Sequence, residues 1–89
     1  CYNCYMRKII DVRESYEFSS GHLDGAINIP LSELEADFSI ATQGLDKNDE
    51  IIVYCRSGSR ASFVQAQLLQ NGFKNVINGI NQQTVASSL

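Results

Sequence analysis

One segment near the middle of the chain, residues 51–60 with the sequence IIVYCRSGSR, constrains the fold more than any other. A run of apolar, mostly β-branched residues ends on Cys55, a short polar loop follows, and helical periodicity then begins. This order predicts a buried strand whose carboxyl end carries a thiol beside the N-terminus of a helix. Units of this kind build parallel sheets that helices cover on both faces.

The loop after Cys55 is suited to holding an anion. Backbone N–H groups of a tight loop converge on a concave site, and the dipole of the next helix adds partial positive charge. Arg56 and Arg60 supply two cations nearby. A thiol in such surroundings loses its proton readily, so Cys55 is the candidate nucleophile.

The rest of the chain alternates between short apolar runs and helical patterns. Strands are predicted over residues 8–12, 26–29, 51–54 and 75–78. Helices are predicted over residues 14–19, 31–38 and 81–89, and from the cysteine loop to residue 70. Ser32 and Ser59 are candidate helix caps, and Asn71-Gly72 predicts a left-handed helix stop. Ala61, Val64 and Leu68 are expected to face the core, joined by Phe63, Ala66 and Leu69. The pattern indicates one α/β domain over residues 1–89.

Composition excludes several classes of function. The 89 residues are 44% hydrophobic and 19% charged, which is typical of one globular domain. The net charge is −3 and no basic stripe with interleaved aromatic residues is present, so we expect no nucleic-acid partner. No apolar run approaches the roughly 20 residues that span a bilayer, so we expect no membrane partner.

Cys1 and Cys4 form a Cys-x-x-Cys at the start of the chain. This spacing occurs in redox pairs and in zinc sites, but a second ligand pair is missing and His22 is the only histidine. We therefore expect no metal and no cofactor, and interpret residues 1–7 as a disordered or engineered terminus. A signal peptide could have been removed before Cys1, so both the cytoplasm and the periplasm remain open.

Three blocks of the sequence resemble the single-domain rhodaneses, a family of sulfurtransferase modules. They are DVRE at 11–14 with EF at 17–18, GHLDGAINIP at 21–30 and YCRSGSR at 54–60. The resemblance implies a three-layer α/β/α rhodanese-like fold with a central, mostly parallel sheet of about five strands. Two features depart from the family: residues 1–7 show no obvious first strand, and Gly79-Ile80 stands where paired glycines are common. A missing edge strand would expose backbone groups, so we expect a monomer or a weak dimer.

The resemblance also implies an activity. Cys55 would take a sulfane sulfur from thiosulfate or a related anionic donor, hold it as a persulfide, and pass it to a thiophilic acceptor such as cyanide, a thiol or a protein. The residues expected to bind the donor are Arg56, Ser57, Gly58, Ser59 and Arg60. Asp11 and Arg13 are candidates for the border of the same pocket.

Most of these residues also have a structural interpretation. Arg56 would otherwise be a solvated loop residue, and Ser59 is as well suited to capping the helix as to catalysis. For Arg60 we favour an ion pair, because a cation in the first turn of a helix opposes the dipole. The block at 11–13 mostly stabilises the fold in this family. His22 invites a general-base role, but a thiolate of low pKa needs no base, so a structural turn is favoured.

Other functions remain as alternatives. Tyrosine and dual-specificity phosphatases, some of which share the rhodanese fold, place a cysteine and an arginine around an anion with five residues between them. Only four residues separate Cys55 from Arg60, a loop that is cramped for phosphate or arsenate, which disfavours a phosphatase or an arsenate reductase. A sulfur relay between proteins, or a regulatory binding module, would show no small-molecule turnover. Many such modules have lost the cysteine that this chain retains.

Overall fold

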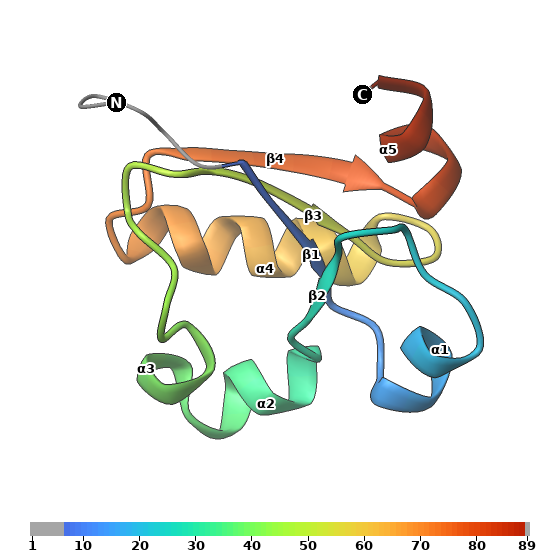
Figure 1. The fold of residues 1–89 in the computed structure, drawn as a ribbon. Coiled ribbons are helices and arrows are strands. Elements are labelled where there is room, and N and C mark those ends of the chain that lie inside the picture. The colour runs from blue at the N-terminus through green and yellow to red at the C-terminus, as the bar shows by residue number, and fades with distance from the viewer. Residues whose placement is uncertain (1–6, 89) are drawn as a thin grey trace.

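A parallel sheet in the order β2-β1-β3-β4 forms the centre of the fold (Figure 1). The structure, a computed structural model, describes residues 7–88. The strands are β1 (Arg7–Asp11), β2 (Ile27–Asn28), β3 (Glu50–Tyr54) and β4 (Asn75–Ile80). The parallel α/β architecture is confirmed, but the described residues form four strands, whereas about five were predicted. The region where a further strand was sought, residues 1–7, lies almost entirely outside the described part of the chain.

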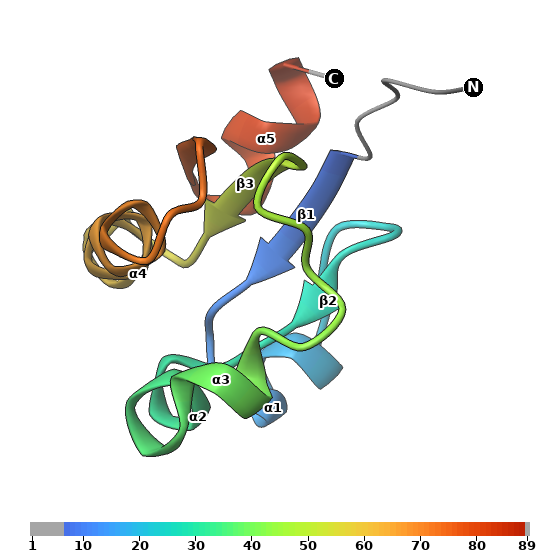
Figure 2. The same cartoon turned by 90° about the vertical axis from the view of Figure 1, so that its left-hand side faces the viewer.

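Helices cover both faces of the sheet. They are α1 (Ser15–Ser19), α2 (Leu31–Ala36), α3 (Phe38–Ala41), α4 (Ser59–Gln70) and α5 (Gln82–Ser88). Figure 2, which looks along the sheet, shows α5 on one side of it and α2, α3 and α4 on the other. The larger core cluster joins Ile10 and Val53 of the sheet to Val64 of α4, and the smaller joins Tyr54 to Val85 of α5. The predicted three layers are therefore present.

The two elements that flank the cysteine agree with the sequence pattern. β3 is an inner strand between β1 and β4, and four of its five residues are buried, which explains its continuous apolar run. In α4 the predicted inward residues Ala61, Val64 and Leu68 are buried. The apolar stripe is narrower than expected, because Ala66 is exposed and Phe63 and Leu69 are both 47% exposed.

Local details of three helices differ from the prediction. The predicted helix over 31–38 is two helices, because Asp37 has an extended backbone and its carboxylate accepts the Ile40 N–H to cap α3. Ser32 does not cap α2, since Pro30 holds that position and the Ser32 hydroxyl donates to the Glu14 carboxylate instead. Gly58 rather than Ser59 is the N-cap residue of α4.

The parallel register brings two sequence blocks to one edge of the sheet. Asp11 at the end of β1 pairs with Tyr54 at the end of β3, and the chain turns into a loop after each. The carboxyl ends of strands in open parallel sheets are where ligand sites form. Within residues 7–88, none of the helices has the length and apolar character that crossing a bilayer requires.

Candidate active site

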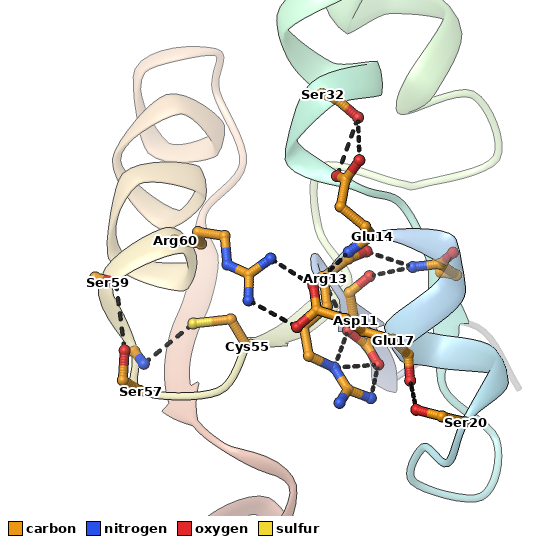
Figure 3. Close-up of polar contacts among 12 residues, drawn as sticks. Asp11, Arg13, Glu14, Glu17, Ser20, Ser32, Cys55, Ser57, Ser59 and Arg60 are labelled. Atoms are coloured by element: carbon orange, nitrogen blue, oxygen red, sulfur yellow. Dashed lines mark hydrogen bonds and ion pairs between the residues drawn. The ribbon is translucent and has the colours of Figure 1, made fainter.

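Cys55 follows β3 directly and lies at the base of the loop that leads into α4 (Figure 3). Cys55 is only 2% exposed, and its backbone N–H donates to the carbonyl of Ile80 at 3.1 Å. The N–H of Gly58 donates to the Cys55 sulfur at 3.1 Å. The sulfur is therefore held within the curve of its own loop, with a backbone donor pointing at it.

The same loop sets the acidity of the thiol. Burial raises the pKa of Cys55, but backbone N–H groups of the loop and of the first turn of α4 more than offset this effect. These groups belong to Ala61, Ser57, Gly58 and Arg60. The pKa of the Cys55 thiol consequently lies below its ordinary value, as expected of a nucleophilic cysteine.

Gly58 gives the loop its curvature. Its φ of +94° is in the left-handed region, where a side chain would be strained. An added Cβ would lie 3.3 Å from Cγ2 of Ile80, so β4 also leaves little room there. Its carbonyl accepts the Ser62 N–H at 2.8 Å, which begins the hydrogen bonding of α4.

The arginines that follow the cysteine have different surroundings. Arg60 donates from Nη1 and Nη2 to both carboxylate oxygens of Glu17 in α1, at 2.8 and 3.2 Å (Figure 3). The favoured ion pair is thus present, and it lowers the pKa of Glu17 to about 2. Arg56 is exposed, and within the described residues it has no ion-pair partner.

Asp11 and Arg13 form the most buried ion pair of the site. Asp11 is inaccessible to solvent, and its Oδ2 lies 2.6 Å from Nη2 of Arg13. The Arg13 guanidinium also donates to the carbonyl of Gly21 at 2.8 Å, and its Cζ lies 5.7 Å from the centre of the Tyr54 ring. These contacts join the DVRE block to the end of β3 and to the turn before β2.

A pocket of about 340 Å³ opens beside the cysteine. Its lining residues are Arg13, Cys55, Arg56, Asn81, Gln82 and Gln83. The lining thus holds three amides and two arginines, of which Arg13 is paired with Asp11 and Arg56 is not, and no carboxylate among the described residues, which suits a small anion. Arg13 is among the lining residues, whereas Asp11 is fully buried and is not. A larger hollow of about 390 Å³ between β2 and the α2–α3 segment has neither a cysteine nor a cation in its lining.

Sequence reasoning missed the amides of Asn81, Gln82 and Gln83. They begin the last helix, far along the chain from Cys55, and reach the pocket because β4 pairs with β3. Amide side chains carry no chemical signal of their own, so only the strand order could have identified them.

The remaining candidates lie at the margin of the site. The hydroxyls of Ser57 and Ser59 are 3.4 Å apart and both residues are exposed. His22 stacks on the ring of Phe18, and its Nδ1 lies 2.8 Å from the Phe18 carbonyl oxygen; it is not among the residues that line the pocket.

Within residues 7–88 no cluster of three or more His, Cys, Asp or Glu side chains is placed to hold a metal. Cys1 and Cys4 lie outside the described residues.

Comparison with known proteins identifies one family and a similar solved structure. The family model of the rhodanese-like domain matches residues 3–80. A solved structure described as a rhodanese with anions from E. coli has a TM-score of 0.76 and 36% identity, covering 90% of this chain and 92% of that one.

Curated relatives are longer proteins. The putative sulfur carrier protein YrkF of Bacillus subtilis is 40% identical over 70 residues, which are 79% of this chain and 36% of that protein. The tRNA uridine(34) hydroxylase of Yersinia enterocolitica is 37% identical over 71 residues, covering 78% of this chain and 20% of that one. The chain therefore spans about a third or less of these relatives.

Proposed function

The chain belongs to the rhodanese-like domain family, and we propose that it is a sulfurtransferase that carries sulfane sulfur as a persulfide on Cys55. One observation carries this proposal. The Cys55 sulfur lies within a loop whose Gly58 N–H donates to it at 3.1 Å, in a pocket lined by Arg13 and Arg56. This arrangement stabilises a thiolate and attracts a small anionic donor.

The first half-reaction loads the cysteine. With thiosulfate as donor, the Cys55 thiolate attacks the outer sulfur and forms a new S–S bond. The bond between the two sulfurs of thiosulfate breaks, and its electron pair leaves with sulfite. Arg56 is the residue best suited to hold the departing oxyanion, because its guanidinium is exposed at the pocket and is not committed to a carboxylate.

The second half-reaction removes the sulfur from Cys55. A thiophilic acceptor such as cyanide attacks the terminal sulfur of the persulfide, forms thiocyanate, and returns the electron pair to Cys55 as thiolate. The terminal sulfur of the persulfide carries negative charge at neutral pH, so the N–H groups that favour the thiolate also suit the loaded state. The loop then needs no large movement between the two halves.

A relay of sulfur between proteins is the second candidate. It is favoured by the similarity to a Bacillus subtilis protein named as a putative sulfur carrier, of which this chain spans 36%. A relay would use the same persulfide but would load from a protein donor. The acceptor would then be a protein thiol rather than cyanide.

The geometry disfavours phosphatase chemistry. In that chemistry the arginine after the loop must face the bound oxyanion. Here Nη1 and Nη2 of Arg60 both donate hydrogen bonds to the Glu17 carboxylate. The short loop offers the anion the backbone N–H groups around Gly58 instead.

Intact-mass measurement tests the proposal. Incubation with thiosulfate is expected to add one sulfur atom, which maps to the peptide that contains Cys55 and is removed by cyanide. Cys55→Ser is the matched control, since it replaces one atom and is expected to gain no sulfur. Loading by a persulfidated protein donor but not by thiosulfate would favour the relay. Loss of all loading with both donors, or loading of Cys55→Ser, would overturn the assignment.

A further inference from the structure

A closed circuit of hydrogen bonds begins and ends at Cys55. The Cys55 N–H donates to the carbonyl of Ile80 at 3.1 Å, and the Ile80 N–H donates to Oδ1 of Asn78 at 2.9 Å. Nδ2 of Asn78 donates to the carbonyl of Gly58 at 3.1 Å, and the Gly58 N–H donates to the Cys55 sulfur at 3.1 Å. The circuit thus ties the sulfur to the end of β4, on the neighbouring strand.

Ile80 closes this circuit in a conformation that isoleucine rarely adopts. Its φ is +73°, and it is the one non-glycine residue with a positive φ in the part of the chain that the structure describes. A β-branched side chain is strained in the left-handed region, and such strain persists only where the surrounding contacts maintain it. Strained residues of this kind gather at functional sites.

An irregularity in the β3–β4 pairing places Ile80 where the circuit needs it. Val53 pairs with Asn78, but the next residue, Tyr54, pairs with Ile80, so Gly79 is an extra residue in β4. A bulge of this type redirects the backbone that follows it. The Ile80 carbonyl is thereby brought to the N–H of Cys55.

The Ile80 side chain also lies against the loop. The position that a Cβ on Gly58 would occupy is 3.3 Å from Cγ2 and 3.6 Å from Cγ1 of Ile80. The Ile80 side chain therefore occupies the side of Gly58 where a Cβ would lie, Asn78 donates to the Gly58 carbonyl, and the Gly58 N–H points at the sulfur. Movement of Gly58 would turn that N–H away.

We propose that Asn78 and Ile80, both in β4, are positioning residues for Cys55. They keep Gly58 in place so that the Gly58 N–H points at the sulfur. The proposal builds on the assigned role of Cys55 as nucleophile. It assigns to the end of β4 a part in that chemistry, although neither residue is among those that line the pocket.

The readout is the rate at which Cys55 reacts with iodoacetamide as a function of pH, because the thiolate is the reacting form. Charged side chains around the site belong to several neighbouring elements. They are Arg56 in the loop, Arg60 of α4, Glu14 and Glu17 beside and within α1, and Asp11 and Arg13 at the end of β1. The residues of α5 that face the pocket are uncharged amides. The substitutions below change none of these groups.

Two variants and two controls test the proposal. Ile80→Gly removes the side chain beside Gly58 but keeps the backbone groups that Ile80 contributes to the circuit, since glycine adopts a positive φ freely. Asn78→Ala removes the bridge between Ile80 and Gly58. Ile80→Val keeps a branched Cβ against Gly58 and is expected to retain wild-type behaviour. Ile77→Ala changes an isoleucine of the same strand with similar exposure, 48% against 43% for Ile80. Thermal unfolding of each variant confirms that it is folded.

Alkylation is followed on the tryptic peptide 48–56, which separates Cys55 from Cys1 and Cys4. Both test variants are expected to shift the pH midpoint upward and to slow alkylation at neutral pH by about threefold or more. The two controls are expected to match the wild type. An unchanged pH profile in folded Ile80→Gly would overturn the proposal, as would an equal shift in Ile77→Ala. If Asn78→Ala does not fold, Ile80→Gly decides alone.

Alkylation requires no sulfur donor, so this test is independent of the proposed sulfur transfer. If the wild type fails to load sulfur but both test variants show the expected upward shift of the alkylation midpoint, the proposed function is contradicted and the positioning roles stand. Normal loading with unchanged profiles in both variants would do the reverse.

Discussion

Arg60 in the first turn of α4 and Glu17 in α1 form an ion pair through two contacts, at 2.8 and 3.2 Å. A cation at this end of a helix opposes the dipole, and the carboxylate of Glu17 offsets that effect. The pair also fixes α1 beside the cysteine loop. The pair occupies the Arg60 guanidinium, and the arginines that line the pocket are Arg56 and Arg13.

Loss of Glu17 is expected to destabilise the fold in a pH-dependent manner. Folding lowers the pKa of Glu17 from 4.5 to about 2, chiefly through the hydrogen bond from Arg60. The stabilisation is therefore full above the unfolded pKa and is lost as the pH falls through the folded value. Glu17→Gln should lower the free energy of unfolding by about 1 kcal/mol at neutral pH. Urea unfolding across this range should show the difference from wild type shrinking as the pH falls from 4.5 towards 2; a constant difference would contradict the assignment.

Replacement of Arg56 is expected to weaken donor binding without affecting the fold. The side chain is exposed at the pocket and has no ion-pair partner within the described residues. Arg56→Ala should raise the KM for thiosulfate about tenfold, as expected for the loss of one charged hydrogen bond. Arg56→Lys keeps the charge but loses the planar guanidinium, so its KM for thiosulfate should lie between those of the wild type and Arg56→Ala. Steady-state kinetics and thermal unfolding provide the measurement, and an unchanged KM would leave Arg56 as a solvated loop residue.

Asp11 is expected to be essential for stability rather than for chemistry. Its carboxylate is fully buried, and it pairs with an Arg13 side chain that is only 12% exposed. Asp11→Asn would leave that guanidinium with an uncompensated charge, and should lower the free energy of unfolding by about 3 kcal/mol. Glu50→Gln breaks the exposed pair with Arg7 and is the control, with an expected change of about 0.5 kcal/mol or less. Equal effects of the two variants in urea unfolding would show that burial does not matter here.

The strand, loop and helix around Cys55 could be predicted because their signals are local. The inner strand β3 is apolar after its first residue, Glu50, and the inward stripe of α4 follows from Ala61, Val64 and Leu68. The break at Asp37 could not be predicted, since an aspartate fits the exposed face of one long helix as well as the cap between two. Its role depends on a backbone conformation that the sequence does not specify.

The contribution of β4 to the site was hidden for a different reason. Ile80 and the amides that follow it reach Cys55 only through the pairing of β4 with β3 and the extra residue within it. Isoleucine is also among the residues least expected at a positive φ, so its type gave no indication of the turn. Tertiary contacts with the loop set the conformation there.

Gly79 is expected to be required for the packing of α5 on the sheet. A Cβ at this position would overlap Cγ2 of Val85 and lie 3.0 Å from Cγ2 of Ile52. Its φ is outside the left-handed region, so steric overlap alone would make Gly79→Ala unfavourable. We expect the free energy of unfolding to fall by about 2 kcal/mol, as for other overpacked cores.

A double-mutant cycle separates this overlap from a general intolerance of substitution in β4. Val85→Ala shortens the side chain that the new methyl group would meet, and by itself it should destabilise the smaller core cluster. If the overlap is the cause, the double variant should lose less free energy of unfolding than the sum of the single losses, by about 1 kcal/mol. Additive losses in urea unfolding would instead mean that Val85 moves aside, and that Gly79 is kept for the backbone geometry of the bulge beside Ile80.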